Sequence, residues 1–235
     1  MHIKDLNRYL LELSENNQRA WFVMNKPRYD ILRAEFLQFV TQVIATVSKF
    51  DPAIADCDPK KAIFRINRDV RFAHDKSPYK TTFSAAIVAS GRKRPSEGGG
   101  PAYYFQLDAK GNLFMALGEY IPPADRVNAI RRRMVDDSAA FIKVFKNKAL
   151  RTTFGSEFQV EAKLARAPKG FDPEHPLIEQ IKLKSFMIWT EYPIAGLDSD
   201  QVCALLCQGF KDGFPLVAWL RSVASSEKTN LGSSD

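Results

Sequence analysis

The chain has 235 residues, of which 45% are hydrophobic and 26% are charged, with a formal net charge of +7. This balance is typical of a globular protein and excludes a largely disordered one. No apolar run approaches the roughly 18 residues that a membrane-spanning helix needs, so we expect no membrane partner. The three cysteines, Cys57, Cys203 and Cys207, form no disulfide framework, and the first residues do not resemble a secretory leader. Together these features predict a cytoplasmic protein.

The first 50 residues are expected to be helical. Apolar residues recur every three or four positions from Ile3 to Leu13 and again from Tyr29 to Val47, which places them on one face of a helix. Asn16 and Asn17 separate the two patterns, and the pair Asp51-Pro52 is expected to end the second helix, because proline has no amide hydrogen to continue it.

The middle of the chain changes to short runs of aromatic and β-branched residues bounded by Gly, Pro and Asn, a pattern typical of strands. The connection 109–112 contains Gly111 and predicts a hairpin. The segment 91–101 carries three arginine or lysine residues and four glycines and predicts an exposed loop. The five predicted strands are 62–66, 81–89, 102–108, 112–117 and 185–191.

Helical patterns return in the last half of the chain. We expect a helical region over 124–150 with a break near Asp136, a short helix over 173–182, and a final helix over 198–224 that Pro215 breaks or kinks. The sequence therefore predicts an α+β fold, with a mainly antiparallel sheet of about five strands packed by N-terminal and C-terminal helices. We expect one domain over residues 1–224 and a disordered tail over 225–235.

The positive charge is concentrated in two segments. Residues 60–94 contain ten Lys or Arg and two Asp, a charge of +8, and residues 125–151 contain eight Lys or Arg and three Asp, a charge of +5. The rest of the chain is therefore acidic, with a charge of −6. Clustered like charges attract counter-ions, so these segments predict a surface that binds anions.

The stretch from Arg65 to Lys80 is the densest polar feature. An arginine recurs at every third position from Arg65 to Arg71, and a guanidinium group can donate two hydrogen bonds to a phosphate or carboxylate. We expect a cationic pocket or groove at one end of the sheet that binds a phosphate- or carboxylate-bearing small ligand. The expected ligand-binding residues are Arg65, Arg68, Arg71, Lys76, Tyr79 and Lys80.

Two other roles remain open for this stretch. Asp69 and Asp75 can pair with the arginines in a purely structural network. A catalytic role is the weaker hypothesis, with Asp69, Lys76 and Tyr79 as candidates, because cationic surroundings lower the pKa of a carboxyl group and make it a poor base. The sequence shows no metal-ligand spacing and no phosphate-binding glycine loop, so we expect no metal and no cofactor. It does not reveal an oligomeric state.

Nucleic acid is the alternative partner. The sequence pI of about 9.3 and the arginine-rich runs 92–94 and 131–133 can supply phosphate contacts. Aromatic side chains can stack on bases where they are exposed. The aromatic candidates are Trp21, Tyr79, Tyr103 and Tyr104, and only one of the last two can face outward from a strand.

The stretch also resembles the signature of a bacterial conserved-hypothetical family, classed as a domain of unknown function. The matching positions are Arg65, Arg68, Asp69, Arg71, Phe72, Asp75, Lys76 and Tyr79. The resemblance continues at Asn16-Asn17, Trp21-Phe22, Tyr103-Tyr104 and the segment 167–171. It implies a single domain spanning nearly the whole chain, and it implies no activity.

Overall fold

The computed structural model describes residues 1–71, 74–89, 100–159 and 162–223. Most of the loop predicted over 91–101 and the tail predicted over 225–235 lie outside these residues. No helix in the described part of the chain is long and apolar enough to cross a membrane.

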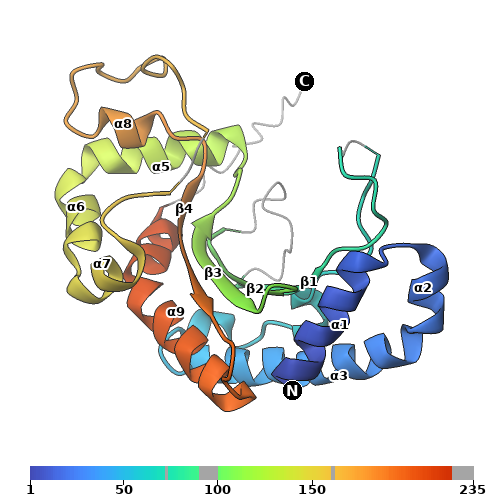
Figure 1. Ribbon diagram of the computed structural model, residues 1–235. Coiled ribbons are helices and arrows are strands. Elements are labelled where there is room, and N and C mark those ends of the chain that lie inside the picture. Colours follow the sequence, from blue (N-terminus) through green and yellow to red (C-terminus); the bar gives the residue numbers. More distant parts are fainter. Residues whose placement is uncertain (72–73, 90–99, 160–161, 224–235) are drawn as a thin grey trace, which may run out of the picture.

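The fold is α+β, with one antiparallel sheet in the middle of the chain and helices on both sides of it in sequence (Figure 1). The strands are β1 (Thr82–Val88), β2 (Ala102–Asp108), β3 (Asn112–Glu119) and β4 (Phe186–Pro193). The helices are α1 (Ile3–Glu15), α2 (Arg19–Met24), α3 (Lys26–Val47), η1 (Pro52–Ile54), α4 (Pro59–Ala62), α5 (Ala124–Asp136), α6 (Ser138–Lys146), α7 (Lys148–Phe154), α8 (Ile178–Ile181) and α9 (Ser199–Ser222).

The sheet has four strands in the order β1-β2-β3-β4, one fewer than the sequence predicts. The missing strand is the predicted run 62–66. Its start belongs to α4, because the Asp58 side chain caps that helix and Pro59 occupies its first turn. The remainder forms the isolated bridge Ile63–Ala85, and the next bridge, Asn67–Tyr79, lies just beyond the run in a register that differs by two residues. A regular ladder cannot continue across that shift.

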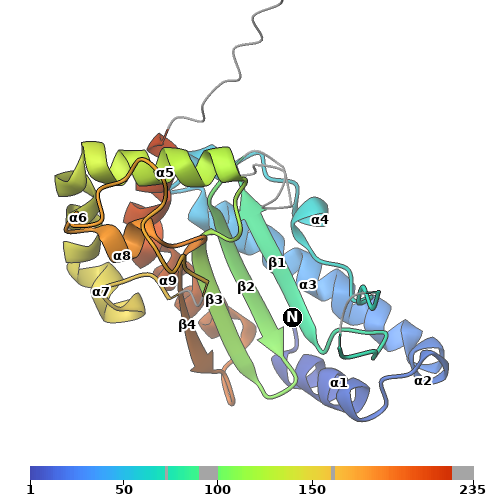
Figure 2. The same ribbon diagram turned by 90° about the horizontal axis from the view of Figure 1, so that it is seen from above.

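One face of the sheet lies against α3 and α9, and the other is turned away from them (Figure 2). Alternation along β2 sets the two faces: Tyr103, Phe105 and Leu107 are fully buried, whereas Tyr104 and Gln106 are half-buried. The hairpin predicted at Gly111 is present, and this glycine has a φ of 79°. We call the second surface the open face of the sheet.

The final helix, α9, continues through Pro215, so it is not broken there, and the alternative of a kink stays a prediction. An internal proline costs about 3 kcal/mol locally. Burial of Leu216, Val217 and Leu220 immediately afterwards offsets this cost, since each side chain is completely inaccessible. The predicted interruption near Asp136 is present, because Asp137 ends α5 and its side chain caps α6. The predicted helix over 173–182 is reduced to α8, residues 178–181.

Two buried ion pairs tie the helices to the sheet. Asp51, after α3, accepts hydrogen bonds from both terminal nitrogens of Arg221 in α9 at 2.6 and 2.8 Å and from the Tyr103 hydroxyl at 2.8 Å. At the end of β3, Glu119 pairs with Arg126 at 2.6 Å, and Arg126 also donates to backbone carbonyls at the end of α9. Both ion pairs therefore hold the same end of the sheet, where β2 begins and β3 ends, against the last turns of α9.

Candidate functional site

The basic stretch forms an arm that leaves the β1 edge of the sheet and returns to it. We call residues 65–71 and 74–80 the basic arm. Its two sides are joined by backbone hydrogen bonds from Lys80 to Ile66 at 2.7 Å and from Arg68 to Pro78 at 2.9 Å. The Asn17 side chain exchanges hydrogen bonds of 2.9 and 3.1 Å with the Tyr79 backbone, which anchors the arm to the N-terminal helices.

Two arginines of the basic arm are paired with its own carboxylates. Arg68 contacts Asp75 at 2.6 Å, and Arg71 donates to both oxygens of Asp69 at 3.0 and 2.7 Å. The hydrogen bonds from Arg71 hold the pKa of Asp69 well below its usual range. Asp69 therefore stays ionised and is a poor proton acceptor near neutral pH. Asp69 follows Arg68 directly in the sequence, but Arg68 pairs with Asp75 instead.

The other two catalytic candidates are held by partners of their own. The Lys76 amino group donates to the Val70 carbonyl at 3.0 Å. Tyr79 is buried, and its ring stacks on Phe22 with 4.1 Å between centroids. These contacts hold the arm in an ordered conformation. Among the described residues, they do not bring Lys76 or Tyr79 into a shared pocket with Asp69, where one could exchange a proton with it.

The remaining cations of the arm, Arg65 and Lys80, have no ion-pair partner among the described residues. Lys80 is half-buried, and its amino group lies 5.3 Å from the centre of the Phe64 ring. Burial, followed by repulsion from Arg65 and Arg68, lowers the pKa of Lys80. Three positive groups therefore influence one another at this edge of the sheet. Within the described part of the chain, Arg68 alone among the three has a carboxylate within ion-pair distance. Such an excess of positive charge favours an external anion.

A row of aromatic side chains begins at these cations and crosses the open face. We call Phe64, Tyr104, Phe114 and Trp189 the aromatic row. The ring centroids of Phe64 and Tyr104 are 6.0 Å apart, those of Tyr104 and Phe114 are 6.1 Å apart, and those of Phe114 and Trp189 are 5.4 Å apart. The first three rings are half-buried, and Trp189 at the other edge of the sheet is 40% exposed.

Both features lie within a region that matches a known family. The family described as conserved hypothetical protein (DUF2461) matches residues 5–219. The chain belongs to this family. The match runs from α1 into α9 and includes the basic arm and the aromatic row, but the family description names no activity. No curated protein and no solved structure matches the chain.

Within this DUF2461 fold, the aromatic residues predicted from sequence are widely separated. Trp21 lies in α2 against Tyr9, with 5.7 Å between ring centroids. Tyr103 is fully buried and Tyr104 faces the open side, so only one of this pair faces outward, as predicted. Sequence reasoning missed Phe114 and Trp189. The alternation of buried Leu113, Met115 and Leu117 around Phe114 was the signal that could have identified it.

The second arginine run does not form a basic surface. Arg131 is buried and donates to the Leu183 carbonyl at 3.0 Å, and Arg133 pairs with Asp137 at 3.0 Å. Arg132 is exposed. The run 92–94 lies outside the described residues. Of the described arginines that were proposed for phosphate contact, those of the basic arm are therefore better placed than those of the run 131–133.

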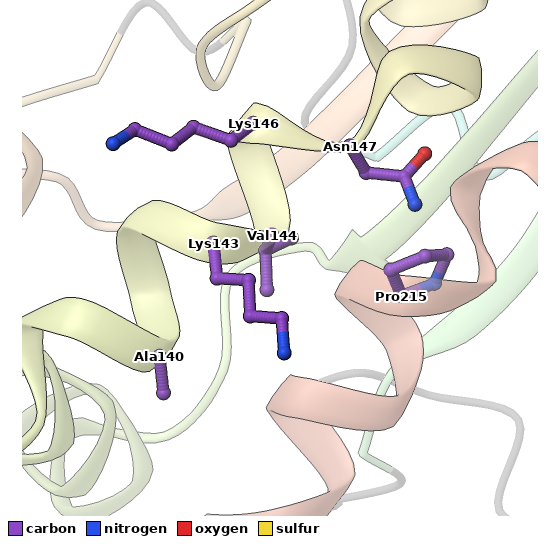
Figure 3. Close-up of a pocket in the computed structure, with 6 residues that line it drawn as sticks. All are labelled: Ala140, Lys143, Val144, Lys146, Asn147 and Pro215. Atoms are coloured by element: carbon purple, nitrogen blue, oxygen red, sulfur yellow. The ribbon is translucent and has the colours of Figure 1, made fainter.

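Two well-defined hollows lie elsewhere, around α6. One has a volume of about 420 Å³ and separates α6 from α9 (Figure 3). In Figure 3 the Lys143 side chain points into this space, whereas the amino group of Lys146 points away from Asn147 and Pro215. The other has a volume of about 280 Å³ and is lined from α6, α7 and the segments around 157 and 177. Neither includes the basic arm, whose charged side chains are mostly exposed. In the described part of the chain, no three His, Cys, Asp or Glu residues gather in a possible metal site.

Proposed function

We propose that the protein binds single-stranded nucleic acid across the open face of the sheet. The observation that carries the proposal is the continuity between two cations that have no ion-pair partner among the described residues and a row of rings that are half-buried or, at Trp189, exposed. Lys80 is close to the Phe64 ring, and the aromatic row continues from Phe64 to Trp189. Proteins that bind single strands commonly combine a positive surface for the phosphates with aromatic side chains for the bases.

The phosphate contacts are assigned to Arg65 and Lys80, with Arg68 as a third. An anion beside Lys80 would relieve the repulsion that lowers its pKa. Arg68 pairs with Asp75, but more than half of the Asp75 side chain is exposed. Exposed ion pairs contribute only about 0–1 kcal/mol, so a phosphate can replace this carboxylate at small cost. Arg71 is assigned a structural role, because Asp69 occupies its guanidinium group.

The bases are assigned to Tyr104, Phe114 and Trp189. Their rings lie on three neighbouring strands, so a strand of nucleic acid would cross β2, β3 and β4. Stacking of a base on an aromatic ring is worth roughly 1–3 kcal/mol and is available to every base. Bases paired in a duplex present only their edges, and this is the reason that the proposal specifies single strands.

A phosphate- or carboxylate-bearing small ligand at Arg65, Arg68 and Lys80 is the second candidate. It rests on the same excess of positive charge. Drug-sized ligands usually occupy pockets that cover most of their surface. The charged groups of the arm are largely exposed, and the two well-defined hollows lie around α6. These observations favour an extended ligand over a small one.

We also propose a bacterial, cytoplasmic setting. The three cysteines are free, and Cys203 and Cys207 are buried in α9. Unpaired thiols are typical of a reducing compartment, where single-stranded nucleic acid is also available.

The direct test measures the affinity for fluorescein-labelled oligo-dT and oligo-U by anisotropy at low salt. We expect both to bind, and Trp189→Leu to weaken binding by roughly 5- to 150-fold, the equivalent of one lost stacking contact. Trp21→Leu is the matched control, because Trp21 lies in α2 away from the aromatic row. Absence of binding to either oligonucleotide, or equal affinities for the two variants, would contradict the proposal.

The second candidate gives a different pattern in the same assay. If the natural ligand is a small phosphate compound, uridine monophosphate will bind as tightly as oligo-U, and Arg65→Gln will weaken both equally. The nucleic-acid proposal expects affinity to rise with oligonucleotide length until the strand spans the aromatic row, because each added base gains a stacking partner.

A further inference from the structure

The 280 Å³ hollow has an aromatic floor. Phe141 and Phe145 reach it from α6, and Phe158 reaches it from the segment after α7. Their rings are 5.0 to 6.0 Å apart, and the Phe141 and Phe158 rings are inclined by only 29°. Phe141 and Phe158 are buried, so this floor is fixed by the core. An apolar ring inserted here would find offset or edge contacts on several sides.

The rim of the hollow carries cations without partners. Lys146 and Arg151 line it and are exposed, and neither has an ion pair or a side-chain hydrogen bond with any described residue. Ser156 and Gln180 add hydrogen-bonding groups. Among the described residues that line the hollow, Glu157 is the only carboxylate, so this part of the rim has a net positive charge. A guanidinium group beside an apolar floor is suited to an anionic group attached to an apolar body.

The volume limits the size of the occupant. A cavity of about 150 Å³ can hold a benzene ring. The hollow, at about 280 Å³, therefore has room for one ring and a short acidic side chain, and is too small for a nucleotide together with its phosphates. It lies on the α6–α7 side of the protein and shares no residue with the basic arm or the aromatic row.

We propose that this hollow binds a small aromatic acid, with its ring on Phe141, Phe145 and Phe158 and its anionic group at Lys146 and Arg151. The site is independent of the proposed nucleic-acid surface. The neighbouring hollow is the weaker candidate, because it has the Lys143 and Lys146 charges but only Ala140, Val144 and Pro215 as an apolar lining.

The test compares 3-phenylpropionate with 3-phenylpropanamide, its neutral counterpart, by titration calorimetry. The carboxylate should bind at least ten times more tightly than the amide. Phenyl phosphate, added as a third probe, distinguishes the kind of anionic group, and preferential binding of it over the carboxylate would still support an aromatic-acid site. Arg151→Gln should weaken carboxylate binding at least ten-fold, and Glu157→Gln should strengthen it, since this change removes a negative group from the rim.

Lys148→Gln is the matched charge control, because Lys148 is exposed in α7 but does not line the hollow. It should leave the affinity unchanged. Phe145→Ala should weaken the carboxylate and the amide alike, and a melting curve without ligand checks that each variant is folded. Equal binding of carboxylate and amide, no binding of any probe at millimolar concentration, or full affinity in both Arg151→Gln and Lys146→Gln would overturn the proposal. Trp189→Leu separates the two sites, since it should not affect this one.

Discussion

At the scale of single residues, burial decides which ion pairs matter. Asp51 is only 1% exposed and accepts hydrogen bonds from Arg221 and Tyr103. Asp69 is paired with Arg71 by equally short bonds, yet both side chains are open to solvent. Water competes for an exposed pair and screens it, whereas a buried charge that loses its partner remains desolvated. The two aspartates should therefore respond differently to mutation.

Asp51→Asn should lower the free energy of unfolding by about 3 kcal/mol, the lower end of the range for breaking a buried pair, because Arg221 remains partly exposed. Urea denaturation measures this change. Asp56→Asn, an exposed substitution in the same turn, should stay within about 0.5 kcal/mol of the wild type. The difference should also depend on pH. Burial raises the pKa of Asp51, but the hydrogen bonds from Arg221 and Tyr103 outweigh it and leave the pKa lowered.

A carboxyl group with a lowered folded-state pKa stabilises the fold above its unfolded pKa, about 3.9, and loses that contribution as the pH falls through its folded-state value. The gap between the wild type and Asp51→Asn should therefore be full at pH 7 and should shrink as the pH drops below about 4. A gap that stays constant down to pH 2 would show that the charge of Asp51 does not contribute.

Asp69→Ala should leave the melting temperature unchanged, because the pair with Arg71 is solvent-exposed. This outcome bears on the structural hypothesis for the basic arm. If the network of Asp69 and Asp75 holds the arm in place, both Asp69→Ala and Asp75→Ala will lower the melting temperature and neither will affect oligonucleotide binding. The charged residues of the arm could be identified from the sequence. The pairing of Arg68 with Asp75 could not, because it depends on how the arm folds back, and no local pattern encodes that.

At the scale of elements, two close approaches determine how the strands and helices fit. Gly118 in β3 has a φ of 125°, and a Cβ atom there would overlap the Phe186 carbonyl of β4. Gly209 and Gly213 in α9 leave room for the side chains of Met115 and Leu117 in β3. In α9 the obstacle is the end of a flexible side chain, whereas in β3 it is backbone, so Gly118 is the stricter requirement.

Gly118→Ala should destabilise the protein more than Gly196→Ala, as measured by thermal or urea unfolding. Both glycines have positive φ, which costs a non-glycine residue about 1–2 kcal/mol. Only Gly118 adds a backbone overlap, because nothing lies within 4 Å of the Cβ position at Gly196. Equal losses of stability in the two variants would mean that β3 and β4 can move apart near Gly118 without lowering the free energy of unfolding.

Elements that local interactions form could be predicted from the sequence, whereas features that depend on distant contacts could not. The helices α1, α3 and α5 carry their own periodicity, the strands β1 to β4 carry their own strand-forming composition, and both were predicted from the sequence. The fifth strand failed because the cap at Asp58 and Pro59 starts a helix where the apolar run begins. The helix is not broken at Pro215, because long-range burial of α9 outweighs a local preference.

At the scale of the whole molecule, the sheet is asymmetric. One face is buried under α3 and α9 (Figure 2). The other carries the aromatic row beside the basic arm. Strand alternation could predict that Tyr103 and Tyr104 face opposite sides. It could not predict that Phe64 and Trp189, which are 125 positions apart, end the same row, because that requires the order and register of all four strands.

The salt dependence of single-strand binding tests the nucleic-acid proposal most directly. The slope of log affinity against log salt counts phosphate contacts at about 0.7 per contact for single strands. The double variant Arg65→Gln/Lys80→Gln should reduce the steepness of that slope by about 1.4, whereas Trp189→Leu should weaken binding with the slope unchanged. Wild-type protein that binds no oligonucleotide at low salt, or a double variant with the wild-type slope, would contradict the assignment of the basic arm to phosphate and the aromatic row to bases.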